Sequence, residues 1–244
     1  MKKAGYQKRS YRSWAESGSM YRAQVIVEET DLLISSDRTI DRDFCKERIS
    51  LYRRQIRAYI SRDERFLTSL EPIAVESTAP SIIQAMADES RKAGVGPMAA
   101  VAGAIAQYLG KDLLRRGSRE VIIENGGDIF LKAEKPVSIG LYAGRSRLSG
   151  KLSLRVYPKG RACGVCTSSG TVGHSLSFGS ADAVVIVAGN AVCADAAATA
   201  TANKVHDKGD FLSAVSFARS IRGVRGVLII VKNDMASWGD MELA

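Results

Sequence analysis

The sequence predicts an α+β protein, in which long helices pack on a largely antiparallel sheet. Amphipathic or small-residue segments of helical length concentrate between residues 40 and 116. Short apolar runs separated by turn residues dominate the stretch from residue 121 to residue 231. Helices and strands do not alternate along the chain as they do in a parallel βαβ fold. A layered arrangement with segregated helices and strands is therefore expected.

The chain has 244 residues, of which 45% are hydrophobic, so it is large enough to bury a substantial core. No linker-like segment or internal repeat interrupts it. We expect one domain over residues 21–244, preceded by a basic tail or an added strand at residues 1–20.

The first half begins with a hairpin and continues with three helices. Residues 21–28 alternate toward a strand, and residues 31–35 form its partner. Apolar residues recur at steps of three to five between residues 40 and 59, which predicts an amphipathic helix capped by Ser36 or Asp37. Residues 81–93 form a second helix, which ends at a glycine.

The third helix covers residues 98–116, and its first half consists almost entirely of small residues. Small side chains let another backbone or a flat ligand approach closely, although tight packing on a sheet explains them equally well. The remaining elements are expected at the following positions: strands at 121–123, 129–131, 137–142, 152–157, 184–187 and 227–231, and helices at 194–205 and 211–221.

The formal net charge of +9 raises nucleic acid as a partner. The basic residues concentrate in the first 20 positions and in residues 38–65, and aromatic residues do not interleave with them as in a stacking platform. A solvated basic face, or attraction for an anionic small ligand, explains the charge better. A basic nucleic-acid-associated protein remains the least favoured of three functional hypotheses.

No apolar run approaches the roughly 20 residues of a membrane-spanning helix, and no secretory signal is recognisable. We therefore expect a cytoplasmic location without a membrane partner. Four cysteines are too few for a disulfide framework. Cys163 and Cys166 form a CxxC motif without the further ligands that zinc needs, so coincidence is favoured and a redox-sensitive pair is the alternative.

A first polar motif, Glu-Asn-Gly-Gly-Asp, occupies residues 124–128 between two predicted strands. Asn-Gly is a favoured two-residue hairpin turn, which is one sufficient explanation. A plain turn does not need the flanking carboxylates of Glu124 and Asp128. The alternative is that a ligand packs on the bare backbone and donates hydrogen bonds to these carboxylates.

A second motif places six hydroxyl groups and two glycines in residues 167–177. Successive amides in such a glycine-containing turn can form an anion-binding concavity. His174 lies within this segment, and because the unperturbed pKa of a histidine is near neutrality, it could serve as an acid, a base or a phosphate donor. A histidine that is hydrogen-bonded for purely structural reasons is the alternative.

A third motif contains Asp195 and Thr199, which are four residues apart in a predicted helix and so share one face. A carboxylate and a hydroxyl on one face suit Mg²⁺, which also binds water and substrate phosphate oxygens. A local hydrogen-bonded pair or cap would explain the same spacing.

Together these motifs resemble the ApbE superfamily, whose best-known members are the FAD:protein FMN transferases. The resemblance runs from about residue 96 to the C-terminus. It rests on residues 124–128, on the Thr-Ser-Ser-Gly segment at 167–170, on Ala-Asp-Ala-Ala-Ala-Thr at 194–199 and on the small-residue helix around residues 101–103. The longer runs at 96–104 and 167–177 resemble a functionally uncharacterised ApbE-like branch, which implies a T-fold-related layered fold.

The resemblance also implies a site. Mg²⁺ would be held by Asp195, Thr199 and the backbone carbonyl of Ala102, and the catalytic groups would be His174 and Asp195. FAD or FMN would lie across the glycine turns, and a homodimer is expected. The implied cofactor-binding residues are Asn125, Gly126, Gly127, Asp128, Thr167, Ser168, Ser169, Gly170 and Thr171.

The sequence also departs from the family pattern. Gly103 and Ala104 stand where the family's Ala-Lys-Gly helix carries its lysine and glycine, and the Asp-Pro-x-Thr-Gly stretch after the histidine is absent. The leading hypothesis is a protein that binds FAD or a related phosphorylated ligand with Mg²⁺ and acts as a flavin transferase or FAD pyrophosphatase. The alternative is a flavin- or nucleotide-binding protein without catalytic activity.

Overall fold

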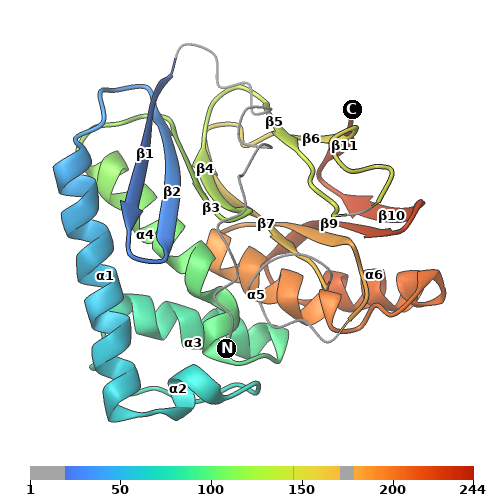
Figure 1. Cartoon of the computed structure of the whole chain (residues 1–244), viewed down its shortest axis with the longest axis horizontal. Coiled ribbons are helices and arrows are strands. Elements are labelled where there is room, and N and C mark those ends of the chain that lie inside the picture. The colour runs from blue at the N-terminus through green and yellow to red at the C-terminus, as the bar shows by residue number, and fades with distance from the viewer. Residues whose placement is uncertain (1–19, 145, 171–178) are drawn as a thin grey trace.

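The computed structural model describes residues 20–144, 146–170 and 179–244, and it contains a large antiparallel sheet covered on both faces (Figure 1). Eight strands form this sheet, and each pairs with its neighbours in antiparallel register. In spatial order they are β1 (Tyr21–Val27), β2 (Thr30–Ser36), β3 (Val121–Asn125), β4 (Asp128–Lys132), β7 (Ala162–Ser168), β8 (Ala183–Ala188), β9 (Val224–Val231) and β10 (Asp234–Gly239).

A smaller sheet covers part of one face of the large sheet (Figure 1). Its strands, in spatial order, are β11 (Glu242–Leu243), β6 (Ser153–Val156) and β5 (Val137–Gly140). Leu154 of β6 is fully buried between the sheets and belongs to one apolar cluster with Leu131, Val165 and Leu228 of the large sheet. The two sheets therefore enclose a core of their own.

The helices cover the opposite face of the large sheet (Figure 1). They are α1 (Arg42–Arg62), α2 (Arg65–Thr68), α3 (Ser81–Ala93), α4 (Val101–Arg115), α5 (Ala191–Ala202) and α6 (Phe211–Ser220), with short 3-10 turns η2 (Pro97–Ala100) and η3 (Lys208–Asp210). Side chains such as Ile34, Ile123, Phe130 and Ile186 join this second and larger core. The predicted α+β layering is thus confirmed. None of the helices in the described ranges is long and apolar enough to cross a membrane.

Helix α5 is the central helix of this layer, because all twelve of its residues are buried. It contacts β7 and β8 on one side and α3 and α4 on the other. Its alanine-rich sequence has no polar face, which is the pattern of a helix enclosed on every side. The side chains of Asp195 and Thr199 are therefore held inside the molecule.

Three predicted helix starts need correction. The cap of α1 is Asp41, whose carboxylate accepts a hydrogen bond from the Phe44 amide at 3.0 Å, and neither Ser36 nor Asp37 caps the helix. Asp37 instead accepts hydrogen bonds from the backbone of residues 119 and 120, which ties it to the start of β3. The helix predicted at 98–116 begins as the 3-10 turn η2 before α4.

The helix predicted at residues 194–205 begins and ends three residues earlier than expected. Its cap is Asn190, whose side-chain oxygen accepts a hydrogen bond from the Cys193 amide at 2.8 Å. The small-residue composition continues on both sides of Asp195, so apolar periodicity could not locate these ends.

Strands β7, β10 and β11 and helix α2 were not predicted.

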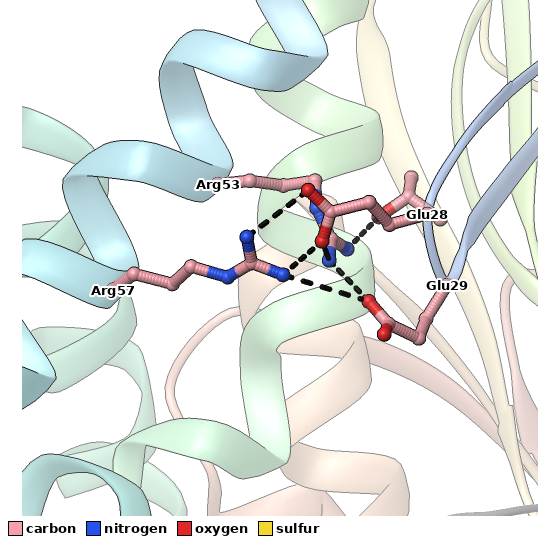
Figure 2. Close-up of polar contacts among 5 residues, drawn as sticks. Glu28, Glu29, Arg53 and Arg57 are labelled. Carbon is pink, nitrogen blue, oxygen red and sulfur yellow. Dashed lines mark hydrogen bonds and ion pairs between the residues drawn. The ribbon is translucent and has the colours of Figure 1, made fainter.

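The tip of the β1–β2 hairpin is fastened to α1 by ion pairs (Figure 2). Arg53 pairs with Glu28 at 2.8 Å and donates to the Thr30 hydroxyl at 2.7 Å. Arg57 also pairs with Glu28, and Arg53 with Glu29. These contacts fix the edge of the sheet against the helical layer.

Candidate functional site

Strand register places three polar or thiol side chains in a row across the middle of the large sheet. Asn125 pairs with Asp128, and Asp128 pairs with Cys166 of β7. Directly opposed residues of antiparallel strands project to the same face. Asn125 contacts α4 and Cys166 contacts α5, so the row lies on the face that the helices cover.

The turn between β3 and β4 consists of Gly126 and Gly127, with φ angles of +70° and +108°. The predicted hairpin is confirmed, but its turn lies one residue beyond the predicted Asn-Gly pair. Two adjacent positive φ angles suit two glycines, and Asn125 is consequently the last residue of β3. The Gly127 amide donates to the Glu124 carboxylate at 2.9 Å, so Glu124 stabilises the turn.

Helices α4 and α5 meet this row through two hydrogen bonds. The Asn125 side-chain amide donates to the Ala102 carbonyl at 3.1 Å. The Gly103 amide donates to the Asp195 carboxylate at 2.8 Å. Ala102, Asn125 and Asp195, which resemblance alone had grouped, thus lie in one hydrogen-bonded cluster joining β3, α4 and α5.

The carboxylates of Asp128 and Asp195 interact electrostatically. Burial raises the pKa of Asp195 from its usual value of 3.8 to about 7, although hydrogen bonds from the backbone at Gly103 and Ala102 oppose the shift. Burial, followed by the negative charge of Asp195, raises the pKa of Asp128 well above its usual value. Two acids this close repel each other when both are ionised.

The donor atoms of this cluster fit a magnesium ion. Mg²⁺ prefers oxygen ligands and is commonly held by one or two carboxylates together with water and substrate phosphate. The cluster offers two carboxylates and the Ala102 carbonyl, while Thr199, 8% exposed, shares one face of α5 with Asp195. Atom Oδ1 of Asp128 is buried and has no hydrogen-bond partner. Within the described ranges, no three His, Cys, Asp or Glu side chains converge as a complete metal cage.

The end of β7 adds the Thr-Ser-Ser-Gly segment to this neighbourhood. Ser168 is two residues beyond Cys166 and so projects to the same face of the sheet. It is 3% exposed, and its hydroxyl has no hydrogen-bond partner. A Cβ atom added at Gly127 would lie 3.9 Å from the Cβ of Thr167, so the glycine turn lies beside this strand end.

Ser169 and Gly170 follow directly, and the Gly170 amide donates to the Ala181 carbonyl at 2.9 Å. The predicted site residues Thr171 and His174 lie outside the described residues. The structural description of the site therefore covers Ala102, residues 125–128, residues 167–170, Asp195 and Thr199.

Two site-shaping residues were missed from the sequence. Gly103 orients Asp195 through its amide, as described above. Gln107 accepts a hydrogen bond from the Ala191 amide at 2.8 Å and so positions the start of α5. The run of small residues at 99–106 signalled a close approach near Gly103, but no sequence signal indicates which backbone Gln107 contacts.

Comparison of this sequence with its relatives identifies the family to which the chain belongs. A family model described as AbpE bacteria matches residues 12–233. The UPF0280 protein MJ1526 of Methanocaldococcus jannaschii is 42% identical over 227 residues, covering 90% of this chain and 91% of the relative. A UPF0280 protein of Methanothermobacter thermautotrophicus is 49% identical over 191 residues, covering 77% of this chain and 74% of that protein.

Solved structures share the fold at low sequence identity. The ApbE protein of Thermotoga maritima superposes with a TM-score of 0.61 and 16% identity, over 89% of this chain and 96% of that one. The flavin transferase ApbE of Vibrio cholerae superposes with a TM-score of 0.57 and 14% identity, over 93% and 97% of the two chains. The chain therefore has an ApbE-like fold and belongs to the AbpE bacteria family, together with its UPF0280 relatives.

Proposed function

We propose that the protein binds FAD, or a related phosphorylated flavin, together with Mg²⁺, and acts on the pyrophosphate as a flavin transferase or FAD pyrophosphatase. The observation that carries this proposal is the convergence of Ala102, Asn125 and Asp195 beside a glycine turn. The fold shared with flavin transferases supports the choice of ligand class.

In this proposal, each residue has a distinct task. Mg²⁺, when bound, would neutralise the pyrophosphate and stabilise the charge that develops as a phosphate bond breaks. Gly103 holds one oxygen of Asp195, and Asn125 holds the Ala102 carbonyl, so both ligands are oriented in advance. The bare backbone of Gly126 and Gly127 leaves room for the ligand, and His174 would hold or move a proton.

The direct test is to incubate the protein with FAD and Mg²⁺ and to quantify AMP and FMN by chromatography. We expect both products from the wild type and only background from Asp195→Asn. Asp112→Asn is a matched control, because Asp112 is a buried carboxylate ten residues further along α4, about 15 Å from Ala102. Product formation in wild type no greater than in Asp195→Asn would refute hydrolysis of FAD at this site.

One observation favours a binding protein without catalytic activity as the second candidate. In the resemblance to the flavin transferases, Gly103 stands where the lysine of their Ala-Lys-Gly helix would be, and a Cβ atom at Gly103 would lie 2.4 Å from the Ala191 carbonyl oxygen. The site therefore has no room for that cationic side chain. This alternative predicts FAD binding by calorimetry without AMP or FMN release, and failure to bind any of a panel of flavins and nucleotides would contradict it.

A further inference from the structure

Asp128 is an ionisable residue in the middle of a cross-strand row that has an apolar residue at each end. Along the row through Asn125, Asp128 and Cys166, the strands on either side contribute Leu32 and Ile186. A buried carboxylate oxygen without a partner costs free energy unless something compensates its charge. Asp128 brings such an oxygen to the side of the sheet that faces Asp195.

We infer that Asp128 is a second carboxylate ligand of the divalent cation, which binds between β4 and α5 with the Ser168 hydroxyl as an adjacent oxygen donor. This inference rests on the proposed function. The family resemblance implies ligands from the helices alone. The inference adds two groups from the sheet, Asp128 of β4 and Ser168 of β7.

A cation explains both carboxylates at once. The Gly103 amide donates to one oxygen of Asp195, whereas Oδ1 of Asp128 is buried and has no hydrogen-bond partner. A divalent ion would compensate both negative charges and satisfy Asp128 Oδ1. One or two carboxylates, together with water and substrate phosphates, are the ligands through which proteins usually bind Mg²⁺.

Ser168 provides an observation that is independent of the acids. Its hydroxyl is buried, is unpartnered and projects to the same face as Cys166, the cross-strand neighbour of Asp128. A buried hydroxyl ordinarily finds a hydrogen-bond partner. An incoming hydrated ion or its ligand would supply that partner beside the two carboxylates.

The test measures Mn²⁺ binding to the full chain at pH 8 by electron paramagnetic resonance and by calorimetry. We expect Asp128→Asn to weaken Mn²⁺ binding by about tenfold or more and Ser168→Ala to weaken it by a smaller factor. Asp112→Asn should bind Mn²⁺ as the wild type does, even if its melting temperature falls.

The stabilisation by Mn²⁺, measured by thermal melting, distinguishes a metal ligand from a residue that only supports the fold. Mn²⁺ should raise the melting temperature of Asp128→Asn by less than it raises that of the wild type, because the variant binds the ion more weakly. Wild-type Mn²⁺ affinity in Asp128→Asn would overturn the inference. If that variant binds normally while the wild type converts FAD, only this inference fails; if the wild type binds no divalent ion, it fails together with the metal-dependent function.

Discussion

Gly103 connects local packing to the chemistry of the site. Its amide orients Asp195, and its missing side chain lets α4 approach α5 closely. An added Cβ atom would lie 2.4 Å from the Ala191 oxygen and 2.9 Å from the Cβ of Asp195. A side chain at position 103 is therefore excluded by packing, since the crossing of the two helices occupies the space.

We predict that Gly103→Lys lowers the free energy of unfolding by about 3 kcal/mol or more, because overpacking and a buried charge add to each other. Urea denaturation followed by circular dichroism measures the change. Gly189→Lys is the matched control, because no atom lies within 4 Å of a Cβ added there. Equal stability of the two variants would contradict the packing argument.

At the scale of single elements, β7 resolves the ambiguity of the CxxC motif. Cys163 belongs to the core beneath the small sheet, whereas Cys166 belongs to the core beneath the helices. Residues three apart on a strand point to opposite faces and are separated by about 10 Å, beyond the reach of a disulfide. The favoured interpretation of the motif as coincidence therefore has a geometric basis.

We predict that diamide forms no disulfide between Cys163 and Cys166 in the folded protein. Burial raises the pKa of the Cys163 thiol to about 11 and that of Cys166 well above its usual value, so both thiols also react slowly. Peptide mapping under non-reducing conditions checks this. Protein unfolded in urea should form the bond, and finding the bond in folded protein would be contrary evidence.

The ion pairs between the β1–β2 hairpin and α1 form a second element-scale feature. Hydrogen bonds from Arg57 and then Arg53 lower the pKa of Glu28 from its usual 4.5 to about 2 (Figure 2). The folded state therefore binds this proton less readily than the unfolded state. The resulting stability is fully present above pH 4.5 and is lost as the pH falls toward 2.

Accordingly, Glu28→Gln should be less stable than the wild type at pH 7, with a difference that shrinks below pH 4.5. Urea midpoints measured between pH 7 and pH 3 test this expectation. Glu47→Gln, an exposed change on α1 outside these ion pairs, is the matched control for the loss of a glutamate. A Glu28→Gln deficit that is constant with pH would exclude the ionic mechanism.

At the scale of the whole molecule, the large sheet separates two apolar cores. The helical core is assembled from α1, α3, α4 and α5, while the other requires the small sheet near the C-terminus. Because β6 supplies the fully buried Leu154, the small sheet is part of the folded unit and not a surface addition.

Truncation of Leu154 should therefore destabilise the protein. We expect Leu154→Ala to cost about 2–5 kcal/mol, the usual range for removing a buried leucine side chain. Leu212→Ala is the matched control, because Leu212 is 87% exposed and its truncation should change stability little. Similar melting temperatures for the two variants would show that the small sheet contributes little to stability.

The sequence by itself determined the layered α+β class, helices α1 and α3, and the hairpin between β3 and β4, although the turn lies one residue beyond the expected Asn-Gly pair. Each of these leaves a local signal, in apolar periodicity or in a required positive φ. The motifs also sufficed to indicate the ApbE-like family, which the comparisons confirm.

Only the tertiary structure decided which polar groups meet. Strand β7 is buried on both faces, so its sequence lacks the alternation that identifies a half-buried strand. Helix α5 is enclosed on every side, so its ends are not marked by polarity. Asp128 and Asp195 come close because strand register and helix crossing bring distant segments together, and neither follows from local sequence.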